Sequence, residues 1–344
     1  MASLKDVATL AGVATGTVSR FLNNPEQVHR KTRAKVQQAI EQLNYSPNML
    51  GRNLRRGHTG LVVVIVPAVG DPFYGEVIRG ITRVGDHLGL SIHIREARAA
   101  GPAQSSDVGD FILSRQAEGI ILLGGPSSYD LSEDFLKRTD HPPIVVAAGR
   151  ASEEYSSFAG VQINNIEASR QLTAYLIGLG HARIGYIRGE PWFRSETDRE
   201  AGYRLAMREA GHRVEESAVT NGNLTIQGAR EATRRLLHVR PRLTAIVCAN
   251  DEMALGTMAE IRASGLDIPG DISVAGFDNI RYSEIATPPL TTIEQPAQLL
   301  GERSLYRLAA AMRDPSSENG IDFVNHRLIV RESTGVAPAR NTDR

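Results

Sequence analysis

The 344-residue sequence lacks what several classes of protein require. It has one cysteine, Cys248, so no disulfide can form within the chain, and the apolar run AIVCA around it predicts a core residue. The longest apolar run, LVVVIVPA at 61–68, is too short to cross a membrane. The N-terminus lacks the charged segment followed by an apolar segment that is typical of a secretion signal. A cytoplasmic protein with no membrane partner is expected.

Charge is balanced over the chain but not along it. The 39 basic and 39 acidic residues cancel, yet residues 1–59 hold nine Lys/Arg against three acids, a net charge of +6. A basic head on an acidic body suggests that only the head contacts a polyanion. A basic face that only meets solvent would give the same excess, so charge alone leaves both readings open.

Apolar residues recur at helical spacing three times in the head. The first series stops at Gly12, and helices near 4–11, 15–23 and 32–43 are expected. The apolar positions are Leu4, Val7, Ala8 and Ala11, then Val18, Phe21 and Leu22, then Val36, Ala39, Ile40 and Leu43. Two short helices joined by a glycine turn and crossed by a third are typical of a helix-turn-helix domain, although any small bundle could share the spacing.

From residue 60 onward, continuous apolar runs alternate with helical patterns. Such runs predict strands of parallel sheets that helices cover on both faces, and the series restarts after about residue 150. The expected strands are 61–66, 91–94, 119–123, 143–148, 183–187, 245–249 and 272–277, and the expected helices are 73–88, 107–116, 131–138, 167–177, 199–210, 226–237 and 252–264. The body is therefore predicted to hold two doubly wound subdomains with a ligand cleft between them.

Motifs along nearly the whole chain resemble the LacI/GalR family of bacterial transcriptional regulators. In the head they are LKDVATLAGVATGTVSRFLNNPEQV, TRAKVQQAIEQLNYSPN and GRNLRRGHT, and in the body they include VIVPAVGDPFYGEVIRGI, DREAGY, CANDEMALG, DISVAGFDN and PPLTTIEQP. GFDNI and PPLTTIEQP are most similar to the cytidine-repressor branch. The resemblance implies a helix-turn-helix head at 1–46, a hinge helix at 47–59 and a periplasmic-binding-protein-like core at 60–344. The core would divide into one subdomain of 60–161 and 292–322 and another of 162–291 and 323–340.

The same resemblance assigns DNA contacts to the head. Thr15, Gly16, Thr17 and Arg20 would face the major groove, where an arginine can bond bidentately to guanine. Phosphate contacts would come from Ser19, Asn23, Thr32 and Tyr45. Ala14 stands where the family usually has serine and so lacks an N-cap oxygen.

The basic linker NYSPNMLGRNLRRGHTG carries one leucine among its arginines. In the family, two such linkers form hinge helices in the minor groove of an operator. Leu54 would then be a wedge between base pairs, with Arg52 and Arg55 on the adjacent backbone. Packing of Leu54 on its own domain is the alternative.

For the core, the resemblance implies an effector site formed by Arg199, Asn250 and Asp278, with Ser195 and Gln295 as further contacts. Phe73 and Tyr74 could stack on a sugar or base ring or could instead be core residues. Asp251 is expected to cap the following helix. Gly149 and Leu224 replace an acid and an aromatic residue common in the family, and Trp192 or Phe193 could supply the missing ring.

Taken together, these features predict a transcriptional repressor that binds a pseudo-palindromic operator on double-stranded DNA as a homodimer or tetramer. A small effector, a sugar or a nucleoside, would control it as an inducer or as a corepressor. No cofactor, metal site or enzymatic activity is expected: GLGHARIG at 178–185 follows a helix and precedes a strand, the reverse of a dinucleotide-binding loop. A solute-binding protein for transport would suit the body but not residues 1–59. In a bacterium the protein would be cytoplasmic and associated with the nucleoid.

Overall fold

The structure is a computed structural model, and it describes residues 2–45, 59–97, 108–114, 116–125, 129, 131, 135, 138, 141–149, 158–314 and 320–338. The chain divides into two compact units, Met1–Thr59 and Gly60–Arg344. The expected hinge helix and most of the expected helix at 131–138 lie outside the described residues. No helix in the described ranges is long and apolar enough to span a membrane.

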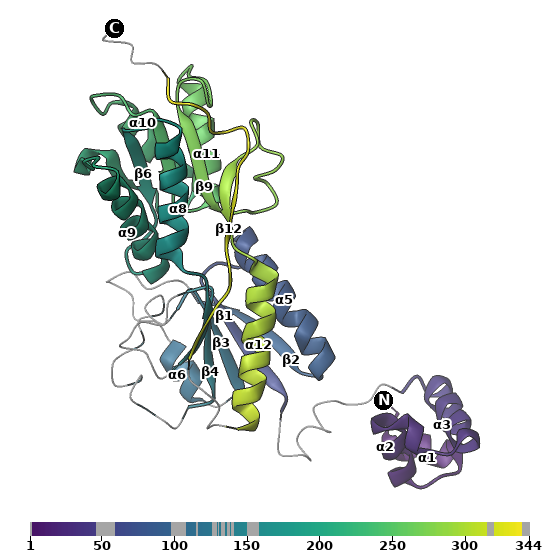
Figure 1. The fold of residues 1–344 in the computed structure, drawn as a ribbon. Helices are drawn as coiled ribbons and strands as arrows, with labels where there is room; N and C mark the ends of the chain where they lie inside the picture. Colours follow the sequence, from purple (N-terminus) through teal and green to yellow (C-terminus); the bar gives the residue numbers. More distant parts are fainter. Residues whose placement is uncertain are drawn as a thin grey trace. The chain divides into compact units, whose positions relative to one another are not determined.

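The head is a helix-turn-helix unit with its own apolar core (Figure 1). Its elements are α1 (Leu4–Ala11), α2 (Thr15–Asn23), the 3-10 turn η1 (Pro25–Gln27) and α3 (Arg30–Gln42). Each of the three helices contributes one fully buried valine, Val7, Val18 or Val36. Ser3 and Asp6 form a capping box at the start of α1, with Ser3 N–H donating to the Asp6 carboxylate at 2.8 Å. The predicted three-helix head is confirmed.

The core contains two six-stranded sheets, and all strand pairs in them are parallel except β10–β12. The first sheet has the order β11-β5-β4-β3-β1-β2 and the second β12-β10-β9-β8-β6-β7. The strands of the first are β1 (Leu61–Val66), β2 (Ser91–Glu96), β3 (Gly119–Leu123), β4 (Ile144–Ala147), β5 (Ala159–Gln162) and β11 (Ile321–Phe323). Those of the second are β6 (Ile184–Arg188), β7 (Val219–Asn221), β8 (Ala245–Cys248), β9 (Ser273–Asp278), β10 (Thr291–Glu294) and β12 (Arg327–Ile329).

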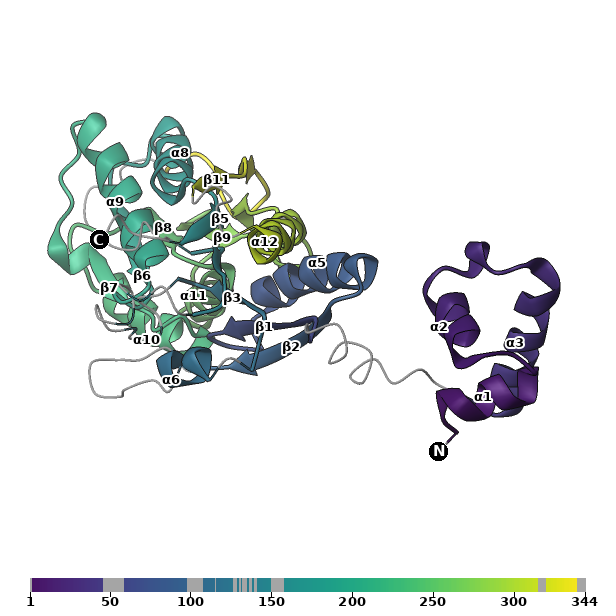
Figure 2. The ribbon, with the colours of Figure 1, turned by 90° about the horizontal axis from the view of Figure 1, so that it is seen from below.

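Helices cover both faces of each sheet, as continuous apolar strands require (Figure 2). In β1, Val62 and Val64 pack toward α5 (Pro72–Leu88) and α12 (Ala297–Arg313), whereas Val63 packs toward α6 (Val108–Leu113). On the second sheet α8 packs against α9, and α10 packs against α11. Their bounds are α8 (Asn165–Gly178), α9 (Arg194–Glu209), the 3-10 turn η4 (Glu216–Ala218), α10 (Ile226–Leu237) and α11 (Asp251–Ala263). The predicted fold, two doubly wound α/β subdomains, is confirmed.

The chain passes between the two sheets three times: after β5, after β10 and after β11 (Figure 1). The subdomain boundaries given above stay an expectation. Strand pairing differs from them by one residue at Gln162 and at Phe323, which pair in the first sheet, and by more at the second passage. β10 pairs with β9 in the second sheet, whereas position 292 was assigned to the first subdomain. The second passage therefore begins only after Glu294.

Several elements were not predicted. The strands β5, β7, β11 and β12 have only three or four residues each, and unlike the equally short β4 and β8 they lack a long continuous apolar run that would reveal them. Helix α12 is different, because buried Leu300, Leu305 and Leu308 give it helical spacing that could have been found. It packs against α5 and covers β3, β4 and β5, so the first subdomain is incomplete without it.

Candidate functional site

A cavity of about 400 Å³ lies at the carboxyl ends of strands from both sheets. Its walls are the segments that follow β1 and β4 in the first sheet and β6, β7, β8 and β9 in the second. The lining residues are Pro67, Ala68, Gly70, Asp71, Phe73, Tyr74, Ala148, Glu190, Trp192, Phe193, Ser195, Glu196, Arg199, Asn223, Leu224, Thr225, Asn250, Glu252 and Asp278. Ligands of parallel sheets bind at this edge. Six of the seven expected effector residues line the cavity, and Gln295 does not.

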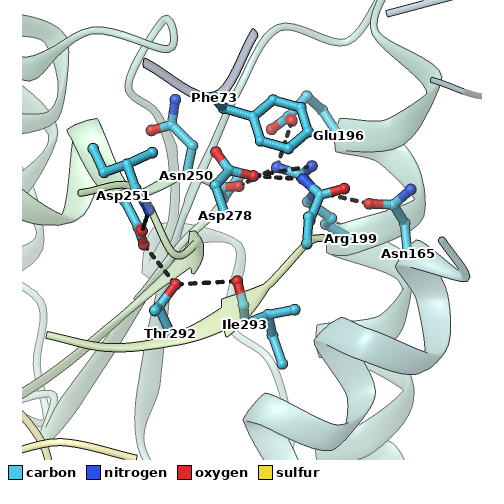
Figure 3. A network of polar contacts seen from close by, with 12 residues as sticks. Phe73, Asn165, Glu196, Arg199, Asn250, Asp251, Asp278, Thr292 and Ile293 are labelled. Atoms are coloured by element: carbon cyan, nitrogen blue, oxygen red, sulfur yellow. Dashed lines mark hydrogen bonds and ion pairs between the residues drawn. The ribbon is translucent and has the colours of Figure 1, made fainter. Parts of the chain in front are cut away.

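Arg199, on α9, is held by the protein on every side (Figure 3). Its Nε donates to Oδ1 of Asn165 at 2.9 Å, and its Nη1 donates to the main-chain oxygen of Ala249 at 2.5 Å. Nη1 also lies 3.2 Å from Oε1 of Glu196, and Nη2 lies 3.6 Å from Oδ1 of Asp278. Arg199 is therefore a fixed cation that positions two carboxyl groups in the cavity wall.

Asp278 ends β9 in a strained backbone conformation, with φ at 114°. Such positive φ values are costly for residues other than glycine and occur often at functional sites. Its Oδ1 accepts a hydrogen bond from Nε2 of Gln295 at 2.6 Å. Burial raises the pKa of Asp278 well above its usual range, against the lowering effect of Arg199. Gln295 thus contacts the site only by its hydrogen bond to Asp278. It lines a second cavity of about 400 Å³, next to the segment after Glu294 where the chain passes between the sheets.

Four aromatic side chains supply the apolar part of the wall. Phe73 and Tyr74 begin α5, and their ring centroids lie 5.4 Å apart. Asp71 caps that helix by accepting a hydrogen bond from the Phe73 N–H at 2.8 Å, which sets where both rings lie. Trp192 and Phe193, which follow β6, line the cavity from the second subdomain. A planar or ring-shaped ligand would find aromatic surface on two sides.

The two polar residues at the start of α11, Asn250 and Asp251, have roles that differ from the expectation. Oδ1 of Asn250 accepts from the Met253 N–H at 2.8 Å, so Asn250 is the cap of α11 and Asp251 is not. Asp251 instead accepts hydrogen bonds from the Ile280 N–H at 2.9 Å and from Ser283 Oγ at 2.6 Å. The assignment of the cap to Asp251 was therefore wrong by one residue. The reason is that the extended backbone of Asn250 places its own oxygen over the free amides of the first turn.

Acidic residues are the part of the site that the sequence analysis missed. Asp71, Glu190, Glu196 and Glu252 line the cavity together with Asp278. Burial raises the pKa of Asp71, Glu196 and Glu252. Glu196 was missed because α9 was expected to start at 199, whereas it begins at Arg194. The spacing of three residues between Glu196 and Arg199 was the available signal, since it puts both on one helix face.

Gly149 and Leu224, the two departures from the family pattern, differ in their surroundings. A Cβ on Gly149 would collide with the main chain of Gly124, so no side chain fits there. Leu224 lines the cavity, and its Cδ2 lies 2.5 Å from the position that a Cβ on Gly189 would take. The acid that is missing at position 149 is thus excluded by packing, and other carboxyl groups supply the negative charge of the site.

In the head, the expected groove-facing residues lie on α2. Thr15, Gly16 and Arg20 are exposed, while Thr17 and Ser19 are half-buried. Val18 points into the head core, which leaves the opposite side of the helix to solvent. Ala14 precedes α2 in an extended conformation with no side-chain cap, as the sequence suggested.

The remaining expected DNA contacts are less fully described. Thr32 is half-buried in the first turn of α3, and Tyr45 packs against the head core. Arg52, Leu54 and Arg55 lie outside the described residues, as does the side chain of Asn23. These assignments stay predictions.

Comparison with known proteins finds matches to both the head and the core. Residues 3–48 match the model for bacterial regulatory proteins of the lacI family, and residues 173–334 match a periplasmic binding protein-like domain. The chain is 34% identical to the HTH-type transcriptional repressor CytR of Escherichia coli (strain K12), over 98% of this chain and 97% of that protein. It is 32% identical to the HTH-type transcriptional repressor PurR of Vibrio campbellii (strain ATCC BAA-1116), over 97% of this chain and 98% of that one.

Solved structures agree with these sequence matches. A lac repressor dimer bound to operator and the anti-inducer ONPF superposes with a TM-score of 0.83 at 27% identity, covering 97% of this chain and 99% of that one. A complex of the transcriptional regulator CelR with cellobiose gives 0.73 at 30% identity, covering 97% and 100%. With both its head and its core matched in order, the chain belongs to the LacI family of bacterial regulatory proteins.

Proposed function

We propose that the protein is a repressor of transcription that binds a pseudo-palindromic operator as a dimer and releases it when a small metabolite fills the cavity. The observation that carries this is one chain with both an exposed helix-turn-helix surface and a polar, aromatic cavity between two sheets. The metabolite is a sugar or a nucleoside. Among the relatives named above, CytR and PurR are transcriptional repressors, and CelR is solved in complex with cellobiose. No turnover of the ligand is expected.

The cavity can act on the head because its walls belong to both subdomains. Asp278 and Arg199 come from the second subdomain, and Phe73 and Tyr74 come from the first. A ligand that contacts residues of both subdomains stabilises one relative position of the subdomains over another, and only such a difference in affinity can shift an equilibrium. The same argument allows a corepressor, which would favour the DNA-binding position.

The test is an operator titration by fluorescence anisotropy with and without nucleosides and sugars. We expect at least one compound to weaken operator binding, and Asp278→Asn to abolish this response while it leaves operator affinity in the absence of ligand within about threefold. Strengthened binding would identify a corepressor. If no compound that binds the core changes operator affinity, the proposed function is wrong.

A further inference from the structure

Acidic groups far outnumber basic groups in the wall of the cavity. Five carboxyl groups line it, and Arg199 is its one cation among the described lining residues. Three of these acids, Asp71, Glu190 and Glu252, lie outside the contacts of Arg199 described above. Like charges repel most strongly where burial keeps water out. A phosphate or carboxylate that entered this cavity would meet acids on both walls.

Arg199 offsets this repulsion poorly for a ligand, because Nε and Nη1 donate hydrogen bonds to the protein and Nη2 is paired with the Asp278 carboxylate. Each of its three nitrogens faces a protein oxygen within 3.6 Å. Its guanidinium also stacks on the Phe277 ring, with Cζ 3.9 Å from the ring centroid. An anionic ligand would have to displace these partners, and that loss makes binding to the guanidinium unfavourable.

Glu196 is the acid that lacks a full set of partners. Its side chain is 6% exposed, and Oε1 faces Arg199. Oε2 is buried and forms no hydrogen bond of ordinary geometry, although the Gly189 N–H faces the carboxyl group and lowers its pKa. Nε1 of Trp192 in the same wall is buried and has no partner either. Buried polar atoms are nearly always hydrogen-bonded, so an acceptor and a donor left over in one cavity indicate a ligand that supplies the complement.

We propose that Glu196 makes the cavity selective for uncharged, hydroxylated or amino-bearing ring compounds, and that it rejects their phosphorylated forms. An O–H or N–H of the effector donates to Oε2 of Glu196, and an acceptor of the effector receives the N–H of Trp192. This rests on the proposed function, in that the ligand of the cavity is the effector.

The carboxyl group of Glu196 occupies space that is free only because residue 189 is glycine. A Cβ there would strike Oε2 of Glu196 and Cδ2 of Leu224, both of which are ends of flexible side chains. Gly189→Ala should therefore move the carboxyl group without removing its charge and without unfolding the chain. Glu200 provides a control on the same helix, since it pairs with Arg204 at 2.8 Å and is not among the lining residues.

The experiment measures binding to the full-length protein by calorimetry with four matched pairs: adenosine and AMP, cytidine and CMP, ribose and ribose 5-phosphate, glucose and glucose 6-phosphate. At least one uncharged member should bind, and its phosphorylated partner should bind about 100-fold more weakly or not at all. Equal or tighter binding of a phosphorylated member overturns the inference, and so does the failure of every uncharged member to bind.

The variants then test whether Glu196 contacts the uncharged ligand. Glu196→Gln and Gly189→Ala should each weaken the uncharged ligand about 10-fold, the loss expected for one hydrogen bond to a charged group, whereas Glu200→Gln should not. Unchanged operator binding shows that each variant is folded. Equal effects of Glu196→Gln and Glu200→Gln would contradict a specific role. The proposed function is tested by a separate measurement: it is wrong if a ligand that binds, whether uncharged or phosphorylated, leaves operator affinity unchanged.

Discussion

Asp251 shows how one buried carboxyl group can organise the region around the site without touching the cavity. It is fully buried and joins three segments: α11, the loop at 280–283, and β10 through Thr292 Oγ1 at 2.6 Å. The loop that it fixes follows Asp278 directly. Burial raises the pKa of Asp251 to about 6, because desolvation outweighs the hydrogen bonds that favour its ionised form.

This raised pKa predicts a pH dependence of stability. The folded protein binds the proton more tightly than the unfolded chain, so the stabilising contribution is complete below about pH 4 and is lost as pH rises through about 6. Relative to Asp251→Asn, the wild-type free energy of unfolding should fall by about 1.4 kcal/mol between pH 5.0 and 7.5. Urea denaturation of both proteins at the two pH values measures it. A constant difference would contradict the shift.

The absence of a cap at Ala14 predicts a stabilising substitution in the head. Its backbone already has the extended conformation of an N-cap, so Ala14→Ser should supply the missing acceptor and stabilise α2 by about 1 kcal/mol. Amide hydrogen exchange of α2 in the full-length protein should then slow about fivefold. Ala34→Ser, at an exposed position inside α3, is the control and should give no such protection.

At the scale of elements, close helix crossings rather than individual contacts hold the first subdomain together. Helices α5 and α12 meet at two glycines: a Cβ on Gly80 would strike the main chain of Gln298, and a Cβ on Gly301 would strike that of Val77. Main-chain atoms cannot move aside as a side chain can. The separation of the two helices is thus set by the absence of side chains at these positions.

A pair of alanine substitutions on α5 tests this. Gly80→Ala should destabilise the core by about 2 kcal/mol because the helices must move apart. Gly75→Ala lies on the same helix, where nothing is within 4 Å of an added Cβ, and should be neutral or stabilising by up to about 1 kcal/mol. Thermal and denaturant unfolding distinguish the two. Similar effects would show that the crossing tolerates a methyl group.

At the scale of the whole molecule, the linker joins the head, which is proposed to bind DNA, to the core, which is proposed to bind the effector. We expect effector binding to influence DNA binding through this segment. Leu54 lies outside the described residues, and its role as a minor-groove wedge stays a prediction from the sequence. Leu54→Ala should weaken operator binding by about 1–3 kcal/mol and reduce DNA bending, while effector binding to the core is unchanged. Gel shifts on circularly permuted operator fragments measure the bend. A normal bend angle with Leu54→Ala would mean that the leucine packs elsewhere.

Much of the architecture could be predicted from the sequence because its signals are local. Helical spacing gave the three head helices, with Val7, Val18 and Val36 inside. Continuous apolar runs such as LVVVIV gave most of the parallel strands, since strands buried on both faces need no polar side. Arg199, Asn250 and Asp278 were named from motifs, and the structure places all three in one cavity.

What the sequence could not decide depends on contacts between distant segments. The strands of three residues exist only through their neighbours, as β11 does beside β5. Asp251 is distinguished from Asn250 by partners about 30 to 40 residues away, Ile280 and Thr292. Glu196 became part of the site only when α9 and the strand ends were brought to one cavity. Periodicity reports which face of an element is buried, but the tertiary structure alone decides which groups meet there, because burial and pairing arise between elements rather than within them.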